Sequence, residues 1–205
     1  MKIKKFLFIA LGAVLCFVPG CAAADSNDPD IVTGSIKMED GDVITFELYP
    51  KTAPQSVRNF VYLARQGFYD GLRFHRIMSG FMIQGGCPEG SGMGNPGYSI
   101  LGEFASNGIE NDLSHTRGVM SMARGGHDYN SAGSQFFICH GDPQFLDGDY
   151  AAFGMVTDGM DVVDQIARIP AINNNGGVLP ENMPIIETII IDGDFEMSEP
   201  DKRSR

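Results

Sequence analysis

Two segments of the chain place hydrophobic residues at the spacing of an amphipathic helix. The first carries them at i, i+3, i+4 and i+7, as Val57, Phe60, Val61 and Ala64. Residues 52–55 (TAPQ) have the pattern of a capping box with Pro54 in the first turn, and we expect Gly67 to end the helix. The second segment has its apolar positions at Met160, Val163, Ile166 and Ala167. We expect it to begin at an Asp158 cap and to end at Arg168, before Pro170.

Most of the other hydrophobic residues follow the alternation of β-strands. Apolar and more polar residues alternate over 44–49 (ITFELY), and a turn at 39–42 (EDGD) joins this strand to another over 32–38. Further short β-like runs occupy residues 119–122, 135–139, 151–156 and 185–191. Residues 85–97 contain six glycines and two prolines and are expected to form a loop. Many short strands with two helices are typical of a barrel or sandwich whose ends are covered by helices.

The first residues of the chain have the pattern of an export signal. Lys2, Lys4 and Lys5 precede thirteen apolar residues at 6–18, a run too short for a comfortable transmembrane helix, which needs roughly 20 residues. Residues 18–21 (VPGC) resemble a bacterial lipobox, in which Cys21 would be acylated. The alternatives are ordinary secretion after the small residues 22–24 (AAA), and retention of the segment as an uncleaved anchor. We favour the lipoprotein.

The sequence therefore divides into four parts. Residues 1–20 are the expected export signal, 21–30 a polar tether, 31–195 one folded domain, and 196–205 a disordered tail, because the tail has mixed charge and only Met197 as a large apolar residue. The protein would be lipid-anchored at the outer face of a bacterial cell membrane, or otherwise secreted. It would touch the membrane only through that anchor.

Charge and cysteine content restrict the function further. The formal net charge is −11, and because the signal contributes three lysines and no acid, the remainder stands at −14. So acidic a domain is a poor partner for nucleic acids, whose phosphates bind clusters of Lys and Arg. Cys87 and Cys139 lie in the body of the chain; Cys139 is expected to be buried, and a bridge between the two stays open. His115, His127 and His140 have no metal-ligand spacing, so no metal site is expected.

Unusual combinations of residues occur in four places. They are FHRIMSGFMIQGG at 74–86, SMAR at 121–124, NSAGSQFFI at 130–138 and FLDGDY at 145–150. Taken with GEF at 102–104 and FG at 153–154, these motifs resemble the cyclophilins, a family of peptidyl-prolyl cis-trans isomerases. The motifs occur in family order with family-like spacing, and the resemblance covers roughly residues 31–195.

The resemblance implies a mainly β fold, a closed eight-stranded antiparallel barrel capped by two α-helices, in a monomer without a cofactor. It implies that proline-containing polypeptides are the substrates and that Arg76 is the catalytic residue. The residues implied to bind substrate are Phe81, Met82, Gln84, Ala123, Arg124, Gln135, Phe137, Phe145, Leu146 and Tyr150. Among them, Ala123 and Arg124 would meet the residue preceding proline. His75 is expected to face the other side of its strand as a structural, hydrogen-bonded histidine.

The chemistry of the reaction explains why such a site needs an arginine. Isomerising an X–Pro bond means twisting an amide across a barrier of ~18–20 kcal/mol that arises from resonance. No bond breaks, so neither a nucleophile nor a metal is required. The twisted imide nitrogen gains a lone pair, and a hydrogen bond to it lowers the barrier. A guanidinium suits this role because it stays charged, planar and directional.

Three features depart from the common eukaryotic pattern and resemble bacterial members. Phe145 stands where many eukaryotic cyclophilins carry Trp, Tyr150 where they carry His, and the chain between Ala123 and Gln135 is two residues longer. They favour weak binding of cyclosporin. Two other functions stay open, a peptide-binding or holdase module and a structural envelope protein.

Overall fold

The computed structural model describes residues 28–204. The expected export signal, the acylation site Cys21 and most of the tether lie outside the described residues. Within residues 28–204, no helix has both the length and the apolar character needed to span a membrane.

Among the described residues, eight antiparallel strands form a single sheet, as the alternation of apolar residues predicts. They are β1 (Val32–Met38), β2 (Val43–Leu48), β3 (Arg76–Met78), β4 (Met82–Gly85), β5 (Val119–Met122), β6 (Phe136–Cys139), β7 (Ala152–Asp158) and β8 (Ile186–Ile191). Their order across the sheet is β3-β4-β6-β5-β7-β2-β1-β8. In β1 and β2 the alternation places Ile36 opposite Ile44, both fully buried.

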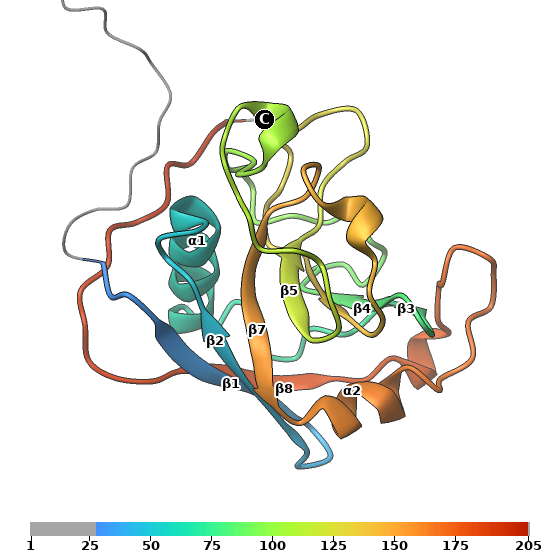
Figure 1. Cartoon of the computed structure of the whole chain (residues 1–205). Coiled ribbons are helices and arrows are strands. Elements are labelled where there is room, and N and C mark those ends of the chain that lie inside the picture. Colours follow the sequence, from blue (N-terminus) through green and yellow to red (C-terminus); the bar gives the residue numbers. More distant parts are fainter. Residues whose placement is uncertain (1–27, 205) are drawn as a thin grey trace, which may run out of the picture.

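The expected closed barrel is wrong, because β3 and β8 remain edge strands and the sheet curls into an open half-barrel (Figure 1). Ahead of both strands a single bridge joins Arg73 to Ile185, but no continuous ladder follows. The edge of β3 is instead occupied by the loop before β8, because Ile77 N donates to Gly176 O at 2.7 Å. The backbone N–H of Ile77, which closure would require, is therefore already hydrogen-bonded to this loop.

Both expected helices are present, as α1 (Pro54–Arg65) and α2 (Met160–Ile166), and in the described part of the chain three short 3-10 helices accompany them. These are η1 (Ala105–Asn107), η2 (Gln144–Leu146) and η3 (Pro180–Asn182). The expected caps are wrong: Ala53 and Gly159 hold the N-cap positions, without side-chain cap hydrogen bonds. In α2 the cap residue has a φ of 86°, which glycine adopts freely.

The side chain of Glu103 caps the N-terminus of α1 in place of an N-cap side chain. Glu103 Oε1 accepts the backbone N–H of Gln55 at 2.8 Å, while Oε2 accepts the backbone N–H and hydroxyl of Ser56 at 2.8 and 2.7 Å. These backbone groups belong to the first turn, where intrahelical partners are absent. The capping group therefore lies nearly fifty residues away in sequence.

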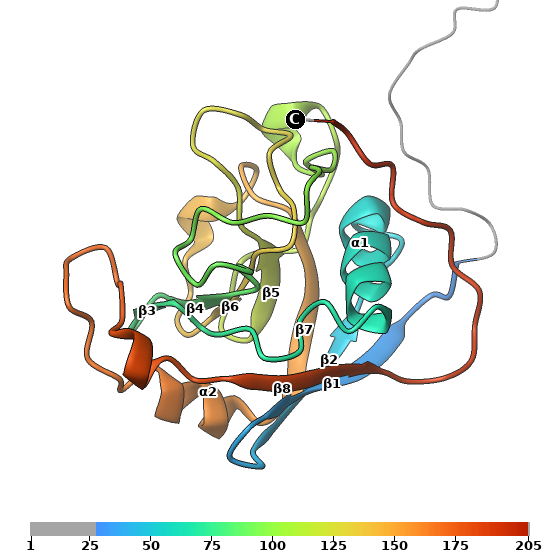
Figure 2. The ribbon, with the colours of Figure 1, turned by 180° about the vertical axis from the view of Figure 1, so that it is seen from behind.

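The helix α1 lies over the concave side of the sheet (Figures 1 and 2). The hydrophobic core fills the space between them. Phe60 of α1 is its centre, with four aromatic rings at centroid distances of 5.2 to 5.7 Å: Phe46, Tyr69, Phe136 and Phe153. All five side chains are fully buried. Such edge-on and tilted packing favours a fixed position of α1 against the sheet.

The end of the chain differs from the expected disordered tail, because residues 196–204 lie along α1 (Figure 2). Asp201 N donates to Gln55 Oε1 at 2.8 Å, and Gln55 Nε2 donates to Asp201 Oδ2 at 3.0 Å. Arg203 and Ser99 exchange two backbone hydrogen bonds, and Met197 packs against the core. Specific polar pairs thus supply the order that the apolar content of this segment does not suggest.

The two cysteines of the domain are buried free thiols, so the bridge left open by the sequence is not formed. Cys139 is fully buried on β6, in agreement with its expected role as a small apolar residue. Burial, followed by the charges of Asp147 and Asp142, raises the pKa of Cys139 to about 12. The thiol therefore stays protonated at neutral pH.

Candidate active site

The residues singled out by the motifs gather on the convex face of the sheet. In the register, Arg76 on β3 lies opposite Gln84 on β4, which lies opposite Phe137 on β6. Their neighbours Ile77, Ile83 and Ile138 belong to the core on the other face. This separation follows from the alternation of side chains along each strand.

Arg76 is held in place from three directions. Its Nη1 donates to Gln84 Oε1 at 3.1 Å, its Nη2 lies 3.1 Å from Met78 Sδ, and its Nε donates to Asn175 O at 2.8 Å. The guanidinium carbon lies 6.0 Å from the centroid of the Phe81 ring. Partial burial lowers the pKa of Arg76, but the ordinary pKa of arginine is so high that the guanidinium remains charged at neutral pH.

The two glutamines form a chain of hydrogen bonds behind this arginine. Gln84 Nε2 donates to Gln135 Oε1 at 2.9 Å, and Gln135 Nε2 donates to the carbonyls of Gly92 and Gly94 at 2.9 and 2.8 Å. Because each amide nitrogen is engaged in this direction, the Gln84 oxygen is turned toward Arg76. The glycine-rich loop therefore takes part in orienting the guanidinium.

Beside Arg76 lies a small apolar cluster that is separate from the main core. Its buried members are Met82, Val119, Phe137, Cys139, Leu146 and Ala152. Phe81, Ala123 and Tyr150 pack against it while remaining partly exposed, and the Tyr150 ring meets Phe137 edge-on at 6.1 Å. An apolar surface beside a fixed cation can receive a ring such as that of proline.

Phe145 and Arg124 lie on either side of this cluster. Phe145 is 74% exposed, and its ring lies 5.5 Å from that of Phe81 at the rim. On the other side, Ala123 N donates to Gln135 O at 3.0 Å, and Arg124 lines a pocket of about 240 Å³ together with both glutamines. The structure thus brings all the expected site residues onto one face.

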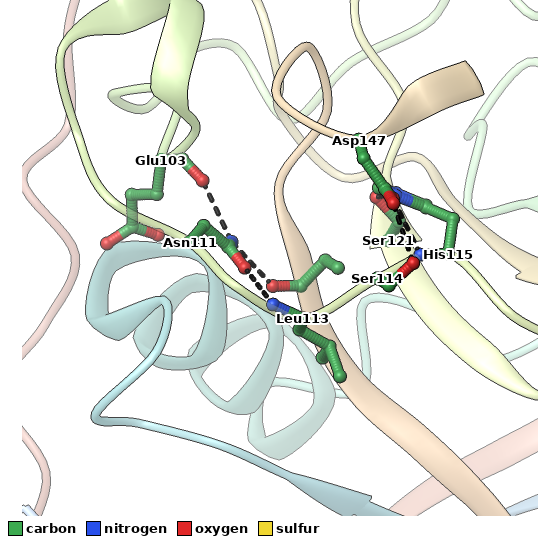
Figure 3. Close-up of polar contacts among 8 residues, drawn as sticks. Glu103, Asn111, Leu113, Ser114, His115, Ser121 and Asp147 are labelled. Carbon is green, nitrogen blue, oxygen red and sulfur yellow. Dashed lines mark hydrogen bonds and ion pairs between the residues drawn. The ribbon is translucent and has the colours of Figure 1, made fainter. Parts of the chain in front are cut away.

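A buried histidine beneath the apolar cluster is a feature that the sequence reasoning missed (Figure 3). His115 Nδ1 lies 2.8 Å from Asp147 Oδ1, and its Nε2 lies 2.9 Å from Ser121 Oγ. The imidazole stacks on Phe137 at 6.0 Å with an angle of 18° between the planes. Burial lowers the pKa of His115, so the ring is neutral at pH 7, with Nδ1 the expected donor to the carboxylate.

These three residues have the order of a Ser-His-Asp triad, but the serine is inaccessible because Ser121 is fully buried. The arrangement instead joins the turn that carries Leu146 and Asp147 to strand β5, below Phe137. Ser114 Oγ adds a further hydrogen bond, because it donates to Asp147 Oδ2 at 2.6 Å. In the sequence, the two parts of this arrangement are visible only as Ser114-His115 and the FLDG motif. Nothing in their spacing revealed the contact.

The segment that leads to His115 is fixed by Asn111 (Figure 3). Its Nδ2 donates to the carbonyls of Glu103 and Ala152, each at 2.9 Å, and its Oδ1 accepts Leu113 N at 3.2 Å. One amide thereby joins the residue that caps α1 to strand β7 and to the start of the histidine turn.

His75 differs from the expectation in one respect. It is buried as expected, but its Nδ1 has no hydrogen-bond partner. Burial lowers the pKa of His75, which keeps the ring neutral and limits the cost of the missing partner. The glycine loop approaches it so closely that a Cβ at Gly92 would lie 3.4 Å from Nε2.

Residues 33–190 match the sequence model of the family described as cyclophilin type peptidyl-prolyl cis-trans isomerase/CLD. The chain belongs to this family. The match includes every residue of the site described above, and the resemblance seen in the motifs is confirmed.

Individual cyclophilins agree with this assignment. The chain is 46% identical over 149 residues to peptidyl-prolyl cis-trans isomerase B of Bacillus subtilis, covering 73% of this chain and 95% of that protein. It is 48% identical over 136 residues to a peptidyl-prolyl cis-trans isomerase of Helicobacter pylori, covering 65% and 79%. The crystal structure of a cyclophilin type isomerase of Cryptosporidium parvum has a TM-score of 0.70 and 30% identity, covering 80% of this chain and 99% of that one. Together they identify this chain as a cyclophilin-type peptidyl-prolyl cis-trans isomerase.

Proposed function

We propose that this cyclophilin accelerates X–Pro isomerisation in exported proteins, assists their folding, and uses Arg76 as its catalytic residue. The observation that carries the catalytic role is the position of the Arg76 guanidinium, fixed by Gln84 at 3.1 Å beside the apolar cluster. The same C. parvum enzyme was crystallised in the presence of the dipeptide Ala-Pro, and that structure has a TM-score of 0.68 with this chain. This supports proline-containing peptides as ligands of this chain.

The mechanism follows from the chemistry of the twisted amide. Phe81, Met82, Phe137 and Leu146 would clamp the proline ring while the preceding carbonyl rotates. Arg76 would donate to the imide nitrogen as its lone pair develops, which stabilises the transition state more than either planar isomer. Gln84 keeps the guanidinium aligned, so little reorganisation is needed during the reaction.

An Arg76→Ala variant tests the catalytic role. We expect kcat/KM for a short X–Pro peptide to fall at least about tenfold, which corresponds to about 1.4 kcal/mol of transition-state stabilisation. The variant should stay folded by circular dichroism, because the side-chain contacts of Arg76, to Asn175, Gln84 and Met78, lie outside the main core. Arg168→Ala, an exposed arginine at the end of α2, is the matched control. Unchanged activity in folded Arg76→Ala would remove Arg76 from this role, and a wild-type rate equal to the uncatalysed one would favour a holdase.

Export is supported by the basic and apolar residues at the start of the chain. We propose that Cys21 is acylated and anchors the protein to the outer face of the cell membrane. Wild-type protein should then sediment with membranes, because two or more acyl chains anchor a protein firmly. The Cys21→Ser variant should not sediment with membranes, because it cannot be acylated at this position. Soluble wild-type protein that begins at Asp25 would contradict the anchor and indicate ordinary secretion.

A further inference from the structure

Arg124 is held among three aromatic rings beside the expected proline site. Its Nε donates to Asp149 O at 2.8 Å and its Nη1 to Gly125 O at 3.0 Å. Three aromatic rings surround the guanidinium carbon at 4.6 to 5.3 Å: Phe104, Tyr129 and Tyr150. The rings and the two carbonyls together hold the guanidinium in one place, but none of them carries a negative charge that would pair with it.

No carboxylate within residues 28–204 pairs with this cation. None of the ion pairs among these residues involves Arg124, and its Nη2 donates to no atom of the described chain. Asp149 contributes only its backbone carbonyl, and Asp128 Oδ1 accepts the backbone N–H of Asn130 in its own loop. The free edge of the guanidinium is therefore available to an external acceptor.

The residues that line the pocket beside Arg124 are suited to an anionic side chain. The pocket has a volume of about 240 Å³, and Arg124 is the one charged residue among those that line it. Its other lining residues are glycines and neutral side chains, including Asn95 and Ser131. A carboxylate entering this space would meet a cation and no competing anion, whereas an ammonium would be repelled.

The pocket adjoins the expected proline site. Gln84, Gln135 and Ala123 all line it, while Gln84 also contacts Arg76 and Ala123 also packs against the apolar cluster. A peptide whose proline occupies that cluster would place a neighbouring side chain over the pocket. We infer that Arg124 makes this isomerase prefer substrates with Asp or Glu close to the N-terminal side of proline. The inference rests on the proposed function and names the substrate class of the same groove.

Peptides that differ in one side chain test this preference. The series has the form acyl-X2-X1-Pro-Phe, with Glu, Gln or Lys at X1 or X2 and Ala at the other, and a protease-free assay avoids the specificity of a coupling enzyme. We expect wild-type kcat/KM to be about fivefold higher for Glu than for Gln at one of the two positions, and lowest for Lys. The ratio should shrink as salt is added, because the pair is partly exposed.

Three variants assign the preference to Arg124. Arg124→Gln should bring the Glu/Gln ratio close to one, and Arg124→Lys, which keeps the charge, should retain part of it. Arg168→Gln removes an exposed charge elsewhere and should leave the ratio unchanged. A wild-type ratio near one at both positions, or an undiminished ratio in Arg124→Gln, would overturn the inference while isomerase activity persists. Absence of acceleration with every peptide would instead refute the proposed function as well.

Discussion

Raising the pH from about 5 to about 8 should destabilise this protein through one buried carboxyl group, Glu103. Its side chain is almost fully buried, and burial raises its pKa from 4.5 to about 7, although donors from Gln55 and Ser56 act in the opposite direction. Because the folded state favours the protonated form, the stabilising contribution is fully present below about pH 4.5 and is lost as the pH rises through about 7. One pKa unit corresponds to about 1.4 kcal/mol, so the loss across this range is about 2–3 kcal/mol.

A Glu103→Gln variant isolates this contribution. Gln cannot ionise, so its free energy of unfolding should lack the decrease seen in wild type between those pH values. The variant should also be less stable at low pH by about 1–3 kcal/mol, because an amide nitrogen must face one of the backbone N–H donors. The chain has no tryptophan, so urea unfolding is followed by far-UV circular dichroism.

Comparing the two proteins removes the effect of other titrating groups. His75 and His115 have lowered pKa values, so their contributions to stability are lost as the pH falls, opposite in sign to that of Glu103. These contributions are common to both proteins and cancel in the difference. Glu110→Gln, an exposed acid on the same segment, is the matched control and should behave as wild type. Parallel stability curves for wild type and Glu103→Gln would show that the three donors keep Glu103 ionised throughout, contrary to the prediction.

Two further predictions concern the rim of the site and the end of the chain. Phe145 supplies an exposed ring without a hydrogen-bond donor, so Phe145→Trp, which adds an indole N–H, should bind cyclosporin about 5- to 150-fold more tightly than wild type, for which we expect weak binding. Inhibition constants for both proteins decide this, and equal constants would show that the donor is irrelevant here. Asp201→Ala removes one side-chain hydrogen bond from Gln55 and should lower Tm by a few degrees, about 1 kcal/mol, in a thermal melt. Exposed Asp112 gives the control Asp112→Ala, and identical melting of Asp201→Ala and wild type would mean that this contact adds no stability.

The sequence predicted the helices and strands better than the contacts between them. The alternation over 44–49 correctly indicated strand β2, and the apolar spacing around Phe60 correctly indicated α1. Both signals are local, since each depends on which face of one element is buried. The site residues came from motif resemblance, and their convergence follows from the register that sets Arg76 opposite Gln84.

Features that depend on distant residues were not predictable in this way. The cap of α1 comes from Glu103, and no pattern near residues 52–55 reveals it. The sheet stays open because the backbone of Gly176, rather than that of β8, receives the N–H of Ile77. The pairing of Asp201 with Gln55 likewise joins two polar side chains far apart in sequence. In each case a tertiary contact overrides the local pattern.

The two faces of the sheet carry separate apolar clusters, and this separation affects which residues of this enzyme can be substituted during evolution. Met82 and Phe137 belong to the smaller apolar cluster beside Arg76, whereas Ile83 and Ile138, one position away, belong to the main core. Substitutions in the smaller cluster leave the packing of the aromatic rings around Phe60 in place, so the stability they cost is lost in that cluster alone. Residues beside Arg76 can therefore diverge between descendants of such a protein while the main core is kept.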